Sequence, residues 1–321
     1  MAPPPVNGLH HITAIAGDPQ ENLDFYTGIL GMRLVKRSVN QDDPSTYHLF
    51  YADAVGHPGA DLTFFPWTMV APPRIGHGLA VEVSLEVPSG TLDFWSSRLE
   101  RYGIALRSDS RFGERAAVMT DPHGLGLSLV EPRTAGRRDF TAWDGGPVAG
   151  EHQIRGLHGA RVWQREAAPS IDFLTGAMGL EQLGTEGEWT RFGARGGAGV
   201  LDVRETPAER RGAWGIGTVH HLAWRVDDEM HQHEIREAVV AAGARATPLI
   251  DRFWFRSVYF KEPGGVLFEL ATDGPGFAVD EDVTHLGETL VLPPRLQGMR
   301  EEIEQQLPRL VMPSMQTPAA E

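Results

Sequence analysis

The chain has 321 residues, a formal net charge of −14 and no cysteine. The acidic balance argues against nucleic acid and anionic membrane as partners, because both require a positive field on the protein. Without cysteine, disulfides, thiolate metal sites and Cys nucleophiles are excluded, so any metal must be bound by His, Asp or Glu. No apolar run approaches the roughly 20 residues that span a bilayer. The start, Met1-Ala2-Pro3-Pro4-Pro5, lacks the features of a secretory signal, so we expect a cytoplasmic protein.

The predicted elements follow one order that recurs along the chain: a strand of alternating residues, a helix, and then short strands. Gly31, Gly103 and Gly243 each follow a predicted helix, because glycine tolerates the positive φ that ends many helices. A Pro-Gly-Gly turn at 263–265 predicts a hairpin near the end of the pattern. The predicted strands include 11–15, 79–83, 257–260 and 266–270, and the predicted helices are 20–30, 91–102 and 231–242.

This recurring order reflects an internal repeat in the sequence itself. Asp, Phe, Thr and two Gly of residues 23–32 return 148 positions later at identical spacing. Two weaker matches follow at slightly shorter offsets, which indicates loops of different length. The matched segments are 8–11 with 156–159, 23–32 with 171–180, 77–80 with 220–223, and 121–124 with 262–265.

The repeat divides the chain into four modules of β-α-β-β-β order. They span 8–66, 76–133, 153–205 and 216–273. We predict an α+β fold in which four βαβββ modules pair into two curved mixed sheets. Residues 1–150 hold the N-terminal pair of modules, and residues 151–321 hold the C-terminal pair plus a tail helix. That helix, at 300–307, carries Ile303 and Leu307 on one face, which favours a covering role over an interaction with another protein.

Three residues of metal-ligand type in modules one and four are replaced in modules two and three. Two His and one carboxylate are the ligand set of the non-haem iron(II) facial triad. A lone His-His pair is more often structural, but three replacements that occur together favour a metal site. We expect modules one and four to form a first cup with the ligands, and modules two and three a second cup without them. The replacements are His11 by Gly159, His221 by Gly78, and Glu269 by Ser128.

A histidine also stands at the first position of each module, whether or not the module carries ligands. We therefore interpret it as a shared packing or hydrogen-bonding residue. Because a regular strand alternates faces, His10 and His11 cannot both point into the cup. Thr13 shares the face of His11 and is either a pocket residue or an ordinary β-branched strand residue. The recurring histidines are His10, His77, His158 and His220.

In combination, these segments resemble the vicinal oxygen chelate superfamily of glyoxalases, bleomycin resistance proteins and extradiol dioxygenases. The likeness is greatest to its ring-cleaving hydroquinone dioxygenases and extends over about residues 8 to 310. Any one segment alone is a weak signal. The segments are Gly8-Leu9-His10-His11-Ile12-Thr13, Asp24-Phe25-Tyr26, Val219-His220-His221-Leu222-Ala223, Asp251-Arg252-Phe253 and Phe268-Glu269-Leu270-Ala271-Thr272-Asp273.

The resemblance implies that His11, His221 and Glu269 hold Fe(II), with Mn(II) as the other metal that suits this ligand set. It also implies an aromatic diol and O2 as the reacting partners. Family members place an Arg and a Tyr near the substrate. As a separate hypothesis, we expect Tyr259 or His220 to move protons. The candidate residues around the substrate are Tyr259, Arg252, Thr13, His10 and His220.

For two of these candidates, the counterpart in the ligand-free modules indicates whether the residue is specific to the ligand-bearing modules. Arg252 matches Arg111, so a structural role stays open for it, whereas Tyr259 matches Val118. The catechol-type enzymes of the superfamily draw their first His from the third module. Because that position here is Gly159, the sequence departs from the catechol pattern and fits the hydroquinone pattern.

Other functions remain open on the sequence alone. A catechol extradiol dioxygenase is the nearest alternative. A glyoxalase-type isomerase would need a further carboxylate ligand where module one has the apolar run 62–65. A metal-free binding protein of the bleomycin-resistance type does not need Glu269, and a structural dimerisation module does not explain the His-to-Gly replacements. A homo-oligomer is compatible with the sequence, which does not define one.

Overall fold

The computed structural model describes residues 4–133 and 138–312. Its strands form two eight-stranded mixed sheets, ordered β14-β15-β16-β13-β1-β4-β3-β2 and β10-β11-β12-β9-β5-β8-β7-β6. The strands of the first sheet are β1 (Leu9–Ala16), β2 (Arg33–Asn40), β3 (Asp43–Ala52), β4 (Asp61–Pro66), β13 (Thr218–Val226), β14 (Ile250–Asp251), β15 (Arg256–Lys261) and β16 (Leu267–Thr272). Those of the second are β5 (Leu79–Glu86), β6 (Arg107–Arg111), β7 (Glu114–Thr120), β8 (Gly126–Glu131), β9 (Gly156–Gln164), β10 (Glu181–Glu186), β11 (Trp189–Gly193) and β12 (Val200–Glu205).

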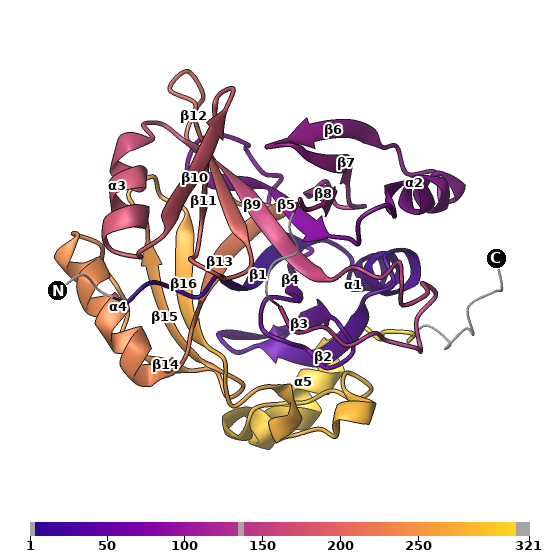
Figure 1. Cartoon of the computed structure of the whole chain (residues 1–321). Helices are drawn as coiled ribbons and strands as arrows, with labels where there is room; N and C mark the ends of the chain where they lie inside the picture. Colours follow the sequence, from indigo (N-terminus) through magenta and orange to yellow (C-terminus); the bar gives the residue numbers. More distant parts are fainter. Residues whose placement is uncertain (1–3, 134–137, 313–321) are drawn as a thin grey trace.

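Each sheet joins strands from distant parts of the chain. In Figure 1 the indigo strands β1 to β4 lie beside the orange strands β13 to β16, so the first sheet combines modules one and four. The second sheet combines modules two and three. The predicted α+β fold and the predicted pairing into two curved mixed sheets are confirmed. Residues 1–150 and 151–321 each contribute half of both sheets.

The helices lie where the repeat predicted them. Helix α1 (Pro19–Leu23) continues directly into η1 (Asp24–Ile29), a π-helical turn, so the predicted helix at 20–30 has two geometries. Strands β15 and β16 are antiparallel partners, which confirms the hairpin. The other helices are α2 (Leu92–Arg101), α3 (Ala168–Gly176), α4 (Glu229–Ala241) and α5 (Arg300–Gln306), with short 3-10 turns η2 (Phe277–Val279), η3 (Val283–His285) and η4 (Pro294–Met299).

One hydrophobic core connects all four modules. It includes Ile12, Trp95, Phe173 and Trp224, one from each module, and all four side chains are buried. Continuous burial of this kind is the main stabilising contribution, at about 25 cal/mol per Å² of apolar surface removed from water. The core therefore holds the two sheets in one fixed relation, on which the geometry of each cup depends.

The C-terminal tail covers the outer strands of the first sheet, below β2 and β3 in Figure 1. Ile303 of α5 and Leu307 are buried in the main core, which confirms the covering role of this helix. The tail is also anchored by the fully buried Lys36, whose Nζ lies 2.8 Å from Asp280 Oδ1 and 2.5 Å from Glu281 Oε2. Because the Trp254 indole N–H donates to Asp280 Oδ2 at 3.1 Å, this cluster also fixes an aromatic ring at the first cup.

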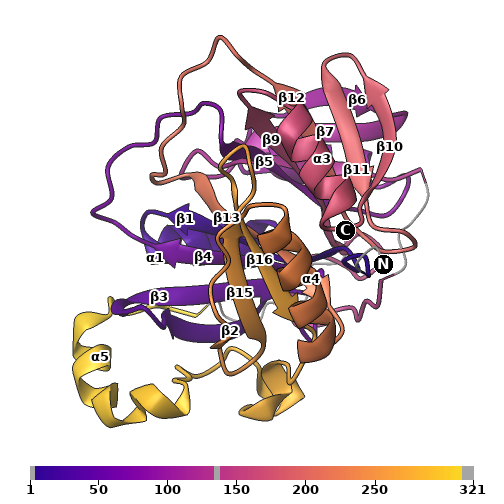
Figure 2. The same cartoon turned by 90° about the vertical axis from the view of Figure 1, so that its left-hand side faces the viewer.

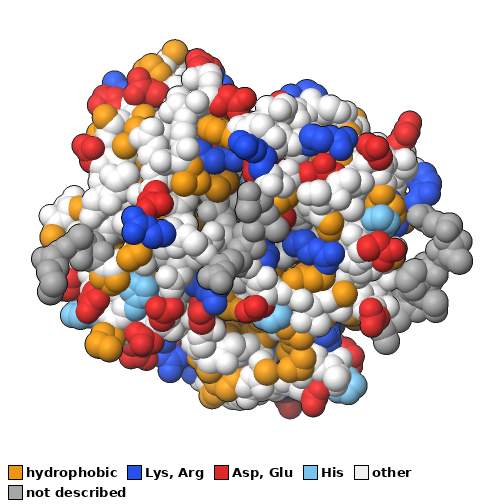
Figure 3. All heavy atoms as spheres, viewed as in Figure 1, with side chains coloured by type: hydrophobic (Ala, Val, Ile, Leu, Met, Phe, Trp, Pro, Cys, Tyr) orange, Lys and Arg blue, Asp and Glu red, His pale blue; other side chains and the backbone are white. Residues whose placement is uncertain are grey.

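The surface shows neither a membrane-spanning helix nor segregated charge on the face in view. Among the described residues, no helix is long and apolar enough to cross a membrane. Acidic and basic side chains are interspersed over the face seen in Figure 3. In Figure 2, two long loops extend at the upper left, above the yellow tail. Backbone pairing of Arg74 with Ala213 joins the segments 66–78 and 206–217.

Candidate metal centre

Two β-bulges bring the predicted ligands to the centre of the first sheet. Strands β1 and β13 pair antiparallel, with His11 opposite Ala223 and His221 opposite Thr13. The register skips His10 on one strand and His220 on the other. A bulge inserts an unpaired residue and redirects its neighbours, and bulges are frequent beside active sites. The expectation that His10 and His11 cannot both point into the cup assumed a regular strand with alternating faces. Strand β1 is irregular at His10, so that rule does not apply there.

The three predicted ligands meet in the first cup. His11 Nε2 lies 3.2 Å from His221 Nε2, and Glu269 Oε2 lies 3.3 Å from the first and 3.0 Å from the second. All three residues are buried, with Glu269 entirely inaccessible. In the part of the chain that the structure describes, they are the one group of three His and carboxylate residues close enough to hold a metal ion.

The donor atoms fit a cation. Glu269 Oε2 is buried and has no hydrogen-bond partner, although buried carboxylate oxygens are normally satisfied. Burial alone would raise the pKa of Glu269, but His11 and His221 outweigh it and hold the pKa well below its ordinary value. A buried carboxylate with an unpartnered oxygen, facing two imidazole nitrogens, is a set of hard and borderline donors that suits Fe(II) or Mn(II).

Each predicted ligand histidine lies within hydrogen-bond distance of the histidine that precedes it in the chain. His10 Nδ1 lies 2.9 Å from His11 Nδ1, and His220 Nδ1 lies 2.8 Å from His221 Nδ1. Burial, followed by the adjacent ligand histidine, lowers the pKa of both His10 and His220 to about 3, so both rings are neutral at pH 7. When the shared proton sits on the ligand ring, its Nε2 lone pair is left for a cation. His10 and His220 are thus placed to orient the two predicted ligands, His11 and His221.

Ser257 supports the third ligand. Its hydroxyl donates to Glu269 Oε1 at 2.5 Å, and it is fully buried on β15. One carboxylate oxygen is thus fixed by the protein while the other stays free. The counterpart of Ser257 in the second cup, by strand register, is Ala116.

Replacing Ser257 with Ala is expected to weaken metal binding about 10- to 100-fold, the usual effect of removing a partner that orients a ligand. The buried Glu269 Oε1 would lose its donor and the carboxylate would be free to rotate. Metal titration of the metal-free protein measures the change. Ser97→Ala, an exposed serine in α2 whose hydroxyl bonds its own helix, is the matched control. Equal affinities for the two variants would contradict the role of Ser257.

Tyr259 and Arg252 lie together at one side of the triad. Tyr259 is directly opposite Glu269 in the β15–β16 register. Burial and then Glu269 raise the pKa of the Tyr259 hydroxyl, so it stays protonated although Arg252 opposes the shift. The Arg252 guanidinium lies 5.3 Å from the centre of the Tyr259 ring. It also forms a two-point ion pair with Asp42, at 3.0 and 2.8 Å.

The cavity beside the triad is small, about 40 Å³. Its lining includes His11, His221, Arg252 and Tyr259, but not His10, His220 or Thr13. Thr13 is fully buried beneath the cavity, and its hydroxyl lies 2.7 Å from Thr63 Oγ1. The lining residues that sequence reasoning did not place are Asn40, Gln41, Asp42, His48, Phe50, Phe65, Trp254 and Phe255.

The second cup has the same strand register, which identifies equivalent positions directly. Gly159 lies opposite Ser84, as His11 lies opposite Ala223. Glu82 lies opposite Arg161, as His221 lies opposite Thr13. The sequence-based match of His221 with Gly78 is therefore wrong, and Glu82 is its counterpart. The His77-Gly78 pair lies just before β5, whereas the His220-His221 pair lies inside β13, so the matching dipeptides are not structurally equivalent.

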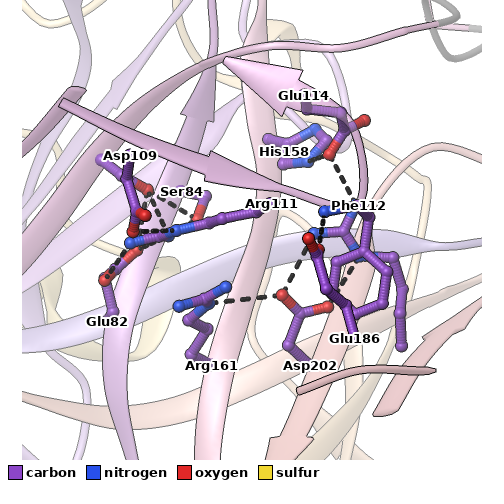
Figure 4. Close-up of polar contacts among 12 residues, drawn as sticks. Glu82, Ser84, Asp109, Arg111, Phe112, Glu114, His158, Arg161, Glu186 and Asp202 are labelled. Atoms are coloured by element: carbon purple, nitrogen blue, oxygen red, sulfur yellow. Dashed lines mark hydrogen bonds and ion pairs between the residues drawn. The ribbon is translucent and has the colours of Figure 1, made fainter. Parts of the chain in front are cut away.

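A chain of ion pairs fills the second cup (Figure 4). Glu82 pairs with Arg111 and accepts a hydrogen bond from Ser128 at 2.8 Å. Across the cup, Arg191 joins Asp202 to Glu114, at 2.7 and 2.5 Å. At the positions equivalent to the predicted ligands, the second cup has a glycine, Gly159, and two side chains, Glu82 and Ser128, that already bond within the protein.

Acid is expected to weaken the second cup. Burial alone would raise the pKa of Glu114, but His158 and Arg191 lower it to about 2. A folded-state pKa below the unfolded value stabilises the protein above the unfolded value, and this contribution is lost as the pH falls from about 4.5 toward 2. Urea unfolding of the metal-free protein from pH 7 to pH 3 tests this. Glu114→Gln should lose stability at pH 7 and show a shallower fall below pH 4.5. The exposed Glu234→Gln should match the wild type, and parallel curves for all three proteins would contradict the expectation.

The chain belongs to the Glyoxalase/Bleomycin resistance protein/Dioxygenase superfamily, whose family model matches residues 8–129 and 156–270. The resemblance inferred from the ligand segments is therefore confirmed. The crystal structure of a protein from Bacillus subtilis subsp. subtilis str. 168 has a TM-score of 0.90 at 42% identity, over 97% of this chain and 99% of that chain. Glyoxalase I from Zea mays shares the fold, with a TM-score of 0.61 at 15% identity over 83% and 92% of the two chains.

Two relatives match almost the whole chain in sequence. The Bacillus subtilis (strain 168) protein named "Putative ring-cleaving dioxygenase MhqO" is 44% identical over 94% of this chain and 95% of its own length. The chlorohydroquinone/hydroquinone 1,2-dioxygenase of Sphingobium indicum is 34% identical over 94% and 96%. The chain is thus similar, over 94% of its length, to proteins named as ring-cleaving or hydroquinone dioxygenases.

Proposed function

We propose that this protein is a ring-cleaving dioxygenase that holds Fe(II) at His11, His221 and Glu269 and opens a hydroquinone-type aromatic diol with O2. The observation that carries the proposal is the buried triad, present in one cup and replaced in the other, with Glu269 Oε2 facing both histidines and otherwise without a hydrogen-bond partner. The relatives named for ring cleavage support the same reaction class. Mn(II) suits the same donors and is the second candidate metal.

When bound, the metal would supply Lewis acidity and a path for electrons between the diol and O2. The protein supplies orientation and charge. Tyr259, which stays protonated, donates a hydrogen bond to a substrate oxygen, and the positive charge of Arg252 stabilises a diol oxygen that has lost its proton. Phe65, Trp254 and Phe255 form an apolar wall that accepts the ring and excludes water.

The overall reaction needs no further oxidant. A carbon–carbon bond of the ring breaks next to a hydroxylated carbon, both atoms of O2 enter the product, and the diol supplies the electrons. Hydroquinone places its two hydroxyls on opposite sides of the ring, so only one of them can reach the triad. Gly159, in the position from which catechol-type enzymes draw their first His, favours the hydroquinone substrate over catechol.

Anaerobic purification with metal analysis, followed by oxygen uptake measurements, tests the proposal. We expect about one equivalent of iron or manganese and oxygen uptake with hydroquinone and chlorohydroquinone. Oxygen uptake with catechol but not with hydroquinone would instead assign the protein to the catechol-cleaving dioxygenases. Absence of bound metal and of uptake with every diol would overturn the dioxygenase proposal and favour a metal-free binding protein. Metal binding without uptake, together with isomerase activity on a glutathione thiohemiacetal, would favour the glyoxalase type.

A further inference from the structure

The cavity wall contains one imidazole to which the proposed chemistry gives no role. His48 lies on β3 and packs against Phe50 and Phe65, with ring centres 3.8 and 4.4 Å apart. Its Nε2 lies 2.9 Å from Thr63 Oγ1, and that hydroxyl lies 2.7 Å from Thr13 Oγ1. Among the contacts of the described residues, Nδ1 of His48 has no polar partner. The ring is therefore held at one nitrogen and open at the other, inside the cavity wall.

The second cup shows that this arrangement changes together with the metal ligands. By strand register, Thr63 and Phe50 correspond to Asp202 and Arg191, which places Trp189 at the position of His48. Thr13 corresponds to Arg161.

In the second cup these positions are charged and aromatic. Arg161 pairs with Asp202 at 3.3 Å, and its guanidinium lies 4.4 Å from the Trp189 ring. The first cup replaces that ion pair with two hydroxyls and an imidazole, none of which carries a fixed charge. An uncharged acceptor with an open nitrogen is suited to a neutral hydroxyl group of a ligand.

The other polar groups of the cavity are less suited to the hydroxyl that does not reach the triad. Arg252 is already engaged by both oxygens of Asp42. Tyr259 lies opposite Glu269 and so belongs to the triad end. His48 lies on β3, two strands from β1, and neighbouring strands are about 4.8 Å apart, which separates their backbones by roughly 10 Å. This separation is suited to an aromatic ring that has one hydroxyl at the triad and the opposite hydroxyl hydrogen-bonded to His48.

We propose that His48 Nδ1 accepts a hydrogen bond from the hydroxyl of a 1,4-aromatic diol that points away from the triad. Thr63 fixes the ring by accepting a hydrogen bond from the Nε2–H group, which leaves Nδ1 as the acceptor, and Thr13 fixes Thr63. His48 thereby selects diols whose second hydroxyl is opposite the first. This inference rests on the proposed function, because it assumes that the first hydroxyl is at the triad.

A comparison of two ligands in two proteins tests the proposal. The ligands differ by one hydroxyl group, and the proteins differ at His48. Under anaerobic conditions, binding of hydroquinone and of phenol to the iron-loaded protein is measured by quenching of tryptophan fluorescence. Phenol lacks only the second hydroxyl. We expect the wild type to bind hydroquinone about 10-fold more tightly than phenol, the usual effect of one hydrogen bond. In His48→Leu that ratio should fall to about 1 while phenol affinity is retained. His285→Leu, an exposed histidine, should keep the wild-type ratio.

The outcomes separate this inference from the proposed function. A 10-fold ratio that survives in His48→Leu would overturn the role of His48, while the dioxygenase proposal would stand. If the wild type bound neither ligand, the proposed function itself would fail, and the inference with it. Thr63→Val, which preserves shape and removes the hydroxyl, provides the second variant in case His48→Leu does not fold. It should lower the ratio by loosening the ring, and in steady state it should raise KM for hydroquinone more than it lowers kcat.

Discussion

Glu269→Ser is expected to abolish metal binding and oxygen uptake while leaving the fold intact. The substitution removes the carboxylate whose Oε2 lies within 3.3 Å of both ligand histidines. A ligand contributes more than the partners that orient it, so metal affinity should fall by more than about 100-fold. The fold should tolerate serine, because Ser128 occupies the equivalent position in the second cup and is fully buried there.

Stability of the metal-free variant provides the sharper part of this test. Removing the charge takes away an ion that is costly to bury, while the two imidazoles can pair with each other or with the introduced hydroxyl. We expect the free energy of unfolding to change by less than about 1 kcal/mol relative to the metal-free wild type. Metal analysis, oxygen uptake and urea unfolding are measured on Glu269→Ser and on the exposed control Glu234→Ser. Retained metal together with retained uptake would show that the ligand assignment is wrong.

The repeat made the fold and the triad predictable from one sequence. Asp24, Phe25 and the paired glycines of the first helix recur in module three, so the module order could be aligned without any other protein. Three ligand-type residues then stood out because they break the repeat, although one of their three matches was misplaced. That error was harmless, because both Gly78 and the true counterpart, Glu82, differ from His221.

The part of the cavity wall that module one contributes beyond His11 was not predictable, for a physical reason. Its residues, such as Asp42, His48 and Phe65, come from the turn and strands that follow the first helix, where modules one and three differ in length. Beyond that point the repeat offset shifts and local similarity disappears, so no internal comparison was left. The bulges at His10 and His220 were also hidden, since a bulge arises from the pairing of two strands distant in sequence. Strand register from the structure recovers the missing match, which aligns His48 with Trp189.

Arg191→Met is expected to lower the free energy of unfolding by about 3 kcal/mol without changing the metal centre, because loss of one partner from a buried ion pair leaves an uncompensated charge. Its guanidinium donates to both oxygens of Asp202, at 2.7 and 3.1 Å, and to Glu114 at 2.5 Å. Methionine keeps most of the side-chain volume, so the effect reports lost charge pairing rather than a cavity. We expect the lower end of the usual cost of 3–5 kcal/mol, because Arg161 still faces Asp202 and His158 still faces Glu114.

Urea unfolding of the metal-free proteins measures this change, and Arg195→Met is the matched control. Arg195 also pairs with a glutamate, Glu181, but its side chain is 81% exposed, and exposed pairs contribute less than about 1 kcal/mol. Equal losses for the two variants would show that the ion pairs of the second cup do not stabilise the fold. The double variant Arg191→Met/Glu114→Gln discriminates further. It should lose less than the sum of the single losses, because neutralising Glu114 removes one of the charges that Arg191→Met leaves unpaired.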